Sequence, residues 1–494
     1  MINYSKYEKV QAVPEASSMI ETFRAIGYTI EAAIADIIDN SISAGAKNIW
    51  IDYEWNGENT AISILDDGLG MTNEELINAM RPGSKHPLDI REKQDLGRFG
   101  LGLKTASFSQ CKKFSVISKI NTGQCSWWCW DLDYINEVKS WQLVKYYPSE
   151  IDFDKLNQLA HGTNVIWWEI DRLTKGATFE NTDALDKFMK VMDNVKKHLA
   201  MVFHRYITEG VKIHLKGREI EPWDPFMIGI EGIQLKADVF LDNRQVMLKG
   251  YVLPHRSRLT TEQYNYGKGP KDSWTAHQGF YVYRNKRLLV AGDWLGIGNF
   301  KKEVHYDLCR IQIDIPNNCD DEWQIDIKKS LARPPLRFRQ QILSVAKDIR
   351  AQAVEVYRHK GKILKRKHSQ NEDQFLWEDY KRHDKRFYKL NRKHPVIKQL
   401  LECGGSYKLE IEKALRFIEE TIPIPLIALK ENENEYPHGQ PFEGTNHDLV
   451  QQTMKAMYQN LLKQGIKNDA AKGIILNIEP FNYYPQYVEF LNTQ

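Results

Sequence analysis

Two polar residues, Asp36 and Asn40, stand four positions apart in the run AIADIIDNSISAGA. On an α-helix this spacing places both side chains on one face, with Asp39 beside them. A carboxylate and a carboxamide arranged in this way can polarise a water molecule and supply an oxygen ligand to a hard cation such as Mg²⁺. The same pattern also fits a solvated polar helix face, so this segment needs support from others.

A second candidate segment is ILDDGLGM, in which an alternating strand ends at Asp66 and is followed by Gly68 and Gly70. An aspartate that leaves a strand into glycines can direct its oxygens into a cleft while the backbone passes close to a flat ligand. A glycine turn with a capping acid is the alternative interpretation of this segment.

A third segment, GRFGLGLKTAS over residues 97–107, carries three glycines immediately before a predicted helix. The free N–H groups at the start of such a helix can bind phosphate. A P-loop is excluded because Leu103 separates Gly102 from Lys104. The order G-x-x-G-x-G also differs from the dinucleotide fingerprint.

The elements around these segments indicate an α+β fold. Apolar residues at three-and-four spacing predict a helix over 28–42, and alternation on both sides of Asn56-Gly57 predicts a β-hairpin. Thr72 and Glu75 form a candidate capping box for a helix through Met80. Further strands are predicted at 113–119, 125–132 and 163–170, and a helix at 182–206. This order favours a mainly antiparallel two-layer sandwich over repeated βαβ units.

In combination and in this order, the three segments resemble the nucleotide-binding domain of the GHKL superfamily, which has the Bergerat-type ATP-binding fold. That superfamily contains DNA gyrase B, the ninety-kilodalton heat-shock chaperones, histidine kinases and the MutL mismatch-repair proteins, and the MORC ATPases are close relatives. The resemblance extends over about Ser17 to Ile170.

The resemblance implies a role for each matching residue. Asn40 would coordinate the Mg²⁺ that bridges the phosphates of ATP, Asp66 would accept a hydrogen bond from the adenine amino group, and Thr163 would support Asp66. The loop from Met80 to Gly97 would be the ATP lid. The nucleotide site implied in this way also includes Gly68, Gly70, Met71, Ser84, Lys85, Gly97, Arg98, Phe99, Gly100, Leu101, Gly102, Leu103 and Lys104.

Catalysis is the point at which this chain departs from the family pattern. Members that hydrolyse ATP usually carry glutamate as general base where this chain has Asp36, whose carboxylate is one methylene shorter. A general base must come within about 2.6 to 3.2 Å of the proton that it removes, so we expect slow hydrolysis. The family's hydrolysing branch also sends a lysine from a second domain to the γ-phosphate. The segment DEWQIDIKKSLARPP offers Lys329 for this role, with Lys328 as the alternative.

We expect four parts along the chain: an ATP-binding domain over 1–205, a transducer-like α+β domain over 206–335, a basic helical region over 336–400 and a small C-terminal domain over 401–494. Lys and Arg (68) nearly balance Asp and Glu (65) overall. Residues 341–400, however, carry 16 Lys or Arg against 7 Asp or Glu, a balance of 16 − 7 = +9. This region is either a solvated helix face or a surface for the DNA backbone.

We therefore expect a slow ATPase that acts as a MutL- or MORC-like clamp, an ATP-dependent homodimer acting on DNA in a prokaryotic defence, restriction or repair system, with separate subunits such as a nuclease. A chaperone-like ATPase with protein clients and a nucleotide-binding scaffold with little hydrolysis are the open alternatives. A histidine kinase is disfavoured because no histidine precedes Asp36. The N-terminus lacks an apolar signal core, and no run of about 18 uncharged apolar residues occurs. We expect a cytoplasmic protein without a membrane partner.

Overall fold

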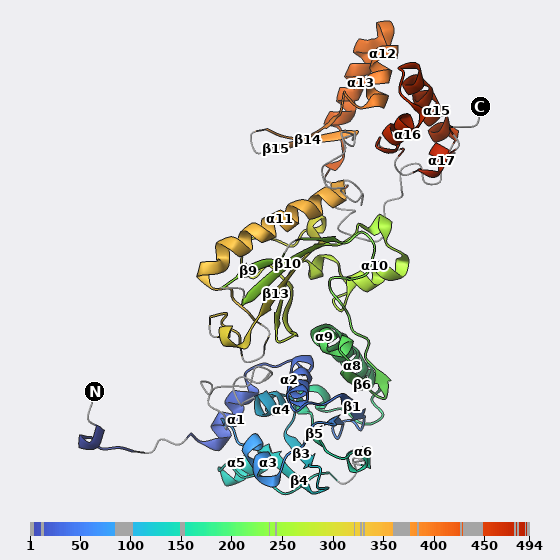
Figure 1. Ribbon diagram of the computed structural model, residues 1–494. Coiled ribbons are helices and arrows are strands. Elements are labelled where there is room, and N and C mark those ends of the chain that lie inside the picture. Colours follow the sequence, from blue (N-terminus) through green and yellow to red (C-terminus); the bar gives the residue numbers. More distant parts are fainter. Residues whose placement is uncertain are drawn as a thin grey trace. The chain divides into compact units, whose positions relative to one another are not determined.

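The chain divides into two compact units, residues 1–363 and 364–494, and each is described by itself (Figure 1). The structure is a computed structural model. It describes residues 4–10, 14–83, 102–148, 154–236, 238–242, 245–320, 322–326, 329, 331–358, 376–382, 385–424, 427, 448–478, 481, 484–489 and 491.

A seven-stranded sheet organises the first half of the first unit, in the order β4-β3-β5-β2-β1-β6-β7. Its pairs are antiparallel except for β1 with β6. This arrangement confirms the predicted α+β class and the predicted hairpin, which is β1–β2. The strands are β1 (Asn48–Glu54), β2 (Ala61–Asp66), β3 (Lys113–Lys119), β4 (Cys125–Asp131), β5 (Gly162–Trp168), β6 (Lys212–Leu215) and β7 (Arg218–Glu219).

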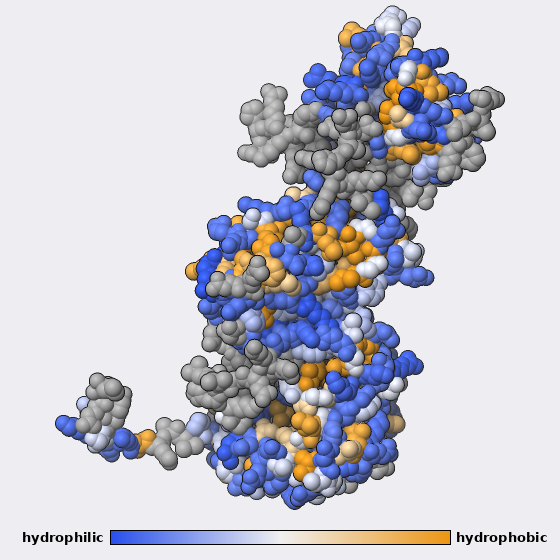
Figure 2. Space-filling model, viewed as in Figure 1, coloured by the Kyte–Doolittle hydropathy of each residue, from blue (hydrophilic) through white to orange (hydrophobic). Residues whose placement is uncertain are grey.

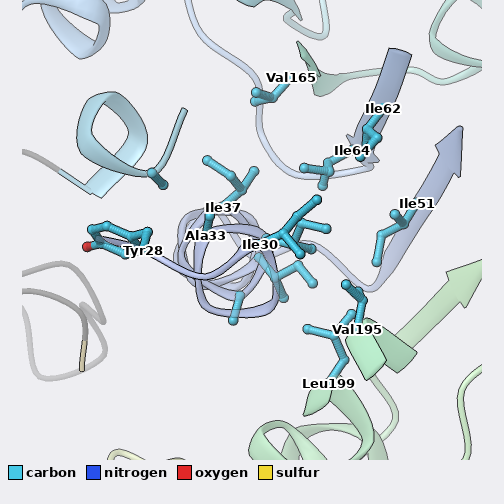
Figure 3. Packing of buried hydrophobic residues seen from close by; sticks show 14 of the residues in the cluster. Tyr28, Ile30, Ala33, Ile37, Ile51, Ile62, Ile64, Val165, Val195 and Leu199 are labelled. Carbon is cyan, nitrogen blue, oxygen red and sulfur yellow. The ribbon is translucent and has the colours of Figure 1, made fainter. Parts of the chain in front are cut away.

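Helices cover one face of this sheet, and α2 (Ile30–Ser43) lies at the centre of that layer (Figure 1). Thr29 caps α2 by accepting from the backbone N–H of Ala32. The apolar side chains of α2 gather with Ile51, Ile62 and Ile64 of the strands and with residues of α8 (Figure 3). The other helices of this half are α1 (Ala16–Arg24), α3 (Asn73–Met80), α4 (Gly102–Gln110), α5 (Leu132–Val138), α6 (Asp154–Gln158), α7 (Asp171–Thr174), α8 (Thr182–Val202) and α9 (His204–Thr208).

The predicted capping box at the start of α3 is confirmed. The hydroxyl of Thr72 accepts from the backbone N–H of Glu75, and the Glu75 carboxylate accepts from the backbone N–H of Thr72. Two otherwise unpaired backbone donors are thereby satisfied, which fixes the start of α3 just after the glycine turn.

A second sheet, of six strands among the described residues, has the order β12-β11-β13-β10-β8, with β9 also paired to β10. Helix α11 packs on β10 and β13 (Figure 1). The expected second domain begins at residue 206, whereas β6 and β7 still belong to the first sheet. The elements are β8 (Gln234–Leu235), β9 (Val239–Leu241), β10 (Val246–Val252), α10 (Thr261–Lys268), β11 (Gly279–Arg284), β12 (Arg287–Asp293), β13 (Cys309–Ile315) and α11 (Arg339–Arg358).

The two sheets of the first unit share a hydrophobic core. Residues of α2 and α8 form one buried cluster with Tyr281 and Tyr283 of β11 and Leu288 of β12. Polar contacts add to this junction, since Arg205 pairs with Asp314. The second sheet is therefore packed directly against the helical layer that contains Asp36.

Within the region 336–400, which was expected to be basic and helical, α11 and α12 are helices, whereas two described segments between them are strands. Residues Trp377–Arg382 (β14) and Lys385–Leu390 (β15) pair as an antiparallel hairpin. Aromatic residues at 380, 387 and 388 favour strands, and the pairing brings Tyr380 opposite Phe387. Helices complete the second unit: α12 (Pro395–Cys403), α13 (Lys408–Glu420), α15 (Asp448–Lys463), α16 (Asn468–Leu476) and α17 (Gln486–Glu489).

The face of the molecule shown in Figure 2 is mainly hydrophilic, with hydrophobic residues in small groups. Among the helices of the described segments, none combines the length and the apolar character that a membrane crossing requires.

Candidate functional site

Asp66, the last residue of β2, is held in a fixed orientation by its neighbours. Its side chain is buried, and Oδ2 accepts from the hydroxyl of Ser41 on α2 at 2.7 Å. Oδ1 accepts from the backbone N–H of Gly68 at 2.9 Å. Burial raises the pKa of Asp66, while these bonds and a backbone bond from Thr163 act in the opposite direction. A carboxylate has about four lone-pair sites, so Asp66 can accept a further hydrogen bond from a ligand amine.

The two glycines after Asp66 are required by close approach within the protein itself. A Cβ on Gly68 would meet Cβ of Ala44 at 2.9 Å. Gly70 has φ +73°, and a Cβ there would lie 2.0 Å from the carbonyl oxygen of Lys119. The turn therefore packs tightly between α2 and the end of β3, which places its backbone beside Asp66.

Replacing Gly70 with Ala is expected to destabilise the first unit by about 3 kcal/mol or more, because backbone strain and a backbone clash add. Gly45→Ala is the matched control, since Gly45 has φ +77° and nothing within 4 Å of a Cβ. It should cost only about 1 kcal/mol. Thermal unfolding of both variants measures the difference, and equal midpoints would contradict the close approach at Gly70.

Ser118 of β3 joins the glycine turn to the start of β5. Its hydroxyl oxygen accepts from the backbone N–H of Met71 at 2.8 Å and lies 2.9 Å from Oγ1 of Thr163. Thr163 stands opposite Asp66 in the β2–β5 register. Thr163 thus adjoins Asp66 as expected, although its hydroxyl is bonded to Ser118.

The middle of α2 lies against the start of α4. A Cβ on Gly102, the first residue of α4, would be 3.7 Å from Oδ2 of Asp36. Lys104 is buried, and its Nζ donates to the carbonyl oxygen of Ala79 at 2.9 Å. Leu103 packs beside the core. The other residues expected in this loop, together with the alternative lysine, lie outside the described residues: Ser84, Lys85, Gly97, Arg98, Phe99, Gly100, Leu101 and Lys328.

Asp36 is buried, with a relative exposure of 2%. Its Oδ2 accepts from the hydroxyl of Tyr28 at 2.9 Å, and in Figure 3 that hydroxyl points away from the isoleucine cluster. Its Oδ1 is buried without a hydrogen-bond partner among the described residues. Burial raises the pKa of Asp36, and the nearby Asp39 raises it further, while Lys329 opposes them. A carboxylate with raised proton affinity and an oxygen that accepts no hydrogen bond among the described residues suits a general base.

Lys329, which follows the last strand of the second sheet in the chain, contacts the Asp36 carboxylate. Its Nζ lies 3.2 Å from Oδ1 of Asp36 and donates to Oδ2 of Asp39 at 2.6 Å. Burial alone lowers the pKa of Lys329, but the two carboxylates outweigh it and the net direction is upward. Lys329 therefore stays cationic. The structure brings Asp36 and Lys329 together. The resemblance implied a γ-phosphate contact for Lys329, and that role stays a prediction.

A second cation completes a buried cluster of four charges. Arg287, at the start of β12, donates from Nε to Oδ1 of Asp39 at 3.0 Å. Its side chain is 4% exposed, and that of Asp39 is 0% exposed. Two carboxylates thus face two cations, so the formal charges of the buried cluster balance.

Asn40 is exposed, one helical turn beyond Asp36. An exposed carboxamide can give one oxygen to Mg²⁺, a cation that takes few protein ligands and completes its shell with phosphate oxygens and water. The donor set therefore fits a metal brought in with a nucleotide.

The site has two ends joined by one helix. Ser41 contacts Asp66, and Asp36 lies five residues earlier on α2, or about 7.5 Å along the helix axis. One end offers a buried carboxylate beside a glycine turn, and the other offers a base, a lysine and a helix start. An elongated ligand with an amine-bearing ring and an anionic tail would match both.

Sequence reasoning missed several residues of the site. Tyr28 and Ser41 both lie within the helix predicted over 28–42, and their hydroxyl groups were the available signal. Asp39 was seen beside Asp36 but had no assigned role. Arg287 lies in the alternating run GFYVYRNKRLLV, for which no site role was predicted.

Part of the chain is similar in sequence to known proteins. Residues 28–163 match the family model described as histidine kinase-, DNA gyrase B- and HSP90-like ATPase. The DNA mismatch repair protein MutL of Dictyoglomus turgidum is 33% identical over 27% of this chain and 24% of its own length. The ATPase morc-1 of Caenorhabditis elegans is 31% identical over 18% of this chain and 10% of its own. The chain thus spans a quarter or less of these relatives.

Among solved structures, the ATPase region of Saccharomyces cerevisiae topoisomerase II aligns with 66% of this chain and 85% of its own, at 13% identity and a TM-score of 0.37.

Proposed function

We propose that this chain, whose residues 28–163 belong to the histidine kinase-, DNA gyrase B- and HSP90-like ATPases, binds ATP with Mg²⁺ and hydrolyses it to ADP and phosphate as a conformational switch. One observation carries the proposal. Lys329, contributed by the segment after the second sheet, contacts Asp36 inside the matched domain. A lysine in that place can respond to a terminal phosphate and couple the two halves of the unit.

Each residue of the candidate site has a separate role in this proposal. Asp66 accepts a hydrogen bond from the adenine amine, while Gly68, Gly70 and Met71 form the turn beside it. Asp36 takes a proton from the attacking water through Oδ1. Lys329 stabilises charge on the terminal phosphate. Asn40 holds Mg²⁺, which when bound neutralises phosphate charge.

The test is phosphate release from Mg-ATP by the purified chain, with EDTA as the control for the metal. We expect slow, EDTA-sensitive turnover. Binding of ATP without any phosphate release would replace the switch by the nucleotide-binding scaffold.

Two chains should associate through their ATP-binding domains when nucleotide is bound, as a MutL- or MORC-like clamp. Mass measurement by light scattering, with and without a non-hydrolysable ATP analogue, tests this step. A monomer in both conditions would contradict the clamp.

DNA is the proposed client, in a prokaryotic defence, restriction or repair setting with separate subunits such as a nuclease. The name of the MutL relative, a DNA mismatch repair protein, supports this choice. Charge supports it too, since residues 377–393 carry 7 Lys or Arg against 3 Asp or Glu. In the β14–β15 register, Lys381 stands opposite Arg386 and Arg382 opposite Lys385, so four basic positions share the end of a two-stranded ribbon. Such ribbons fit the major groove of DNA.

Changing the four ribbon positions, Lys381, Arg382, Lys385 and Arg386, to Gln should weaken DNA binding and flatten its salt dependence. Each lost phosphate contact lowers the log–log slope by about 0.9. The matched control changes exposed basic residues of α13 to Gln, namely Lys408, Lys413 and Arg416. Fluorescence anisotropy at several salt concentrations measures both. Equal loss in both variants would contradict a ribbon site, and no DNA binding by the wild type would favour a chaperone with protein clients.

A further inference from the structure

The buried charge cluster contains one carboxylate whose two oxygens are both bound by cations. Oδ1 of Asp39 accepts from Arg287 and Oδ2 accepts from Lys329 at 2.6 Å. The same lysine lies 3.2 Å from Asp36 without a hydrogen bond to its Oδ1. Asp39 is therefore the closer and better aligned partner of Lys329.

Arg287 is itself fixed by several contacts. Its guanidinium lies 4.7 Å from the centre of the Phe203 ring, and Nη1 donates to the carbonyl oxygen of Leu288. The adjoining turn is attached to the end of the α8–α9 segment, because the hydroxyl of Tyr206 donates to the carbonyl oxygen of Asn285. Arg287 thus joins the second sheet to α2 through a rigid, buried contact.

From this geometry we propose that Asp39 and Arg287 are positioning residues that anchor Lys329 beside Asp36. The anchor holds the lysine within reach of Asp36. When Lys329 turns toward an incoming terminal phosphate, its contact with Asp36 is released and that with Asp39 remains. The catalytic part of this inference rests on the proposed function, whereas the anchor itself does not.

The anchor can be tested without turnover by labelling Lys329 with acetic anhydride and reading the fragment spectra of its peptide. Asp39→Asn should raise the labelling rate of Lys329 about tenfold, because only the neutral amine is acetylated and the amide removes the closest carboxylate that binds the lysine and raises its pKa. Lys286→Met is the control, since Lys286 is exposed and pairs with Glu209 on the surface. Unchanged Lys329 labelling in Asp39→Asn would overturn the anchor.

Steady-state kinetics then separate positioning from binding. Arg287→Met and Asp39→Asn should lower kcat about ten- to a hundredfold and change KM less than about threefold. Equal losses in Lys286→Met would overturn the specific role of Arg287. If the wild type does not hydrolyse ATP while the labelling still responds to Asp39→Asn, the proposed function fails and the anchor stands.

Discussion

Replacing Asp66 with Asn is expected to weaken ATP binding about a hundredfold. The carboxylate is buried and accepts from Ser41 and Gly68, and it is the acceptor proposed for the adenine amine. An amide presents one acceptor oxygen and one donor nitrogen, so at least one donor now facing Asp66 would meet an N–H group. Losing hydrogen bonds to a charged acceptor costs about 3 kcal/mol, which corresponds to a Kd about a hundredfold higher.

Isothermal titration with a non-hydrolysable ATP analogue measures the Asp66 effect. Asp67→Asn is the matched control, because Asp67 is the adjacent carboxylate and accepts from the backbone of Lys47 and Asn48 at the sheet edge. Circular dichroism and thermal unfolding establish that both variants are folded. Binding by a folded Asp66→Asn variant with wild-type affinity would place the adenine elsewhere.

Replacing Asp36 with Asn should remove hydrolysis while leaving nucleotide binding nearly intact. General-base catalysis contributes about 10²- to 10⁴-fold, and the amide cannot take the proton. The oxygen of Asn can still accept from the Tyr28 hydroxyl, so the local packing is preserved. We expect a kcat about a thousandfold lower, with the Kd for the analogue changed by less than about threefold.

Single-turnover phosphate release measures the Asp36 effect, and Glu31→Gln at the start of α2 serves as control. Asp36→Glu keeps a carboxylate and should retain at least about ten times the activity of Asp36→Asn. Wild-type turnover by Asp36→Asn would show that another group activates the water.

Local patterns were sufficient for the elements that carry the site. Helix α2, the β1–β2 hairpin and the capping box of α3 follow from periodicity, turn residues and caps, which are properties of neighbouring residues. The candidate residues Asp36 and Asp66 were recognisable for the same reason, because each lies in a short motif of characteristic type and spacing.

Residues 377–382 and 385–390 were expected in a helical region, but they form the β14–β15 hairpin. Strand pairing depends on a partner and not on one segment alone. A run rich in Lys and Arg suits an exposed helix or a ribbon equally well. The parallel pairing of β6 with β1 is a similar case, since it joins segments about 160 residues apart in the chain.

The buried cluster of Asp36, Asp39, Arg287 and Lys329 was predictable only in part from the sequence. The sequence motifs and the family resemblance were enough to select Asp36 and Lys329 as separate candidate residues. The preference of Lys329 for Asp39, and the contact of Arg287 with the same carboxylate, came only from the packed structure. These contacts span 290 and 248 positions, and they form because burial leaves two carboxylates and two cations no water with which to pair.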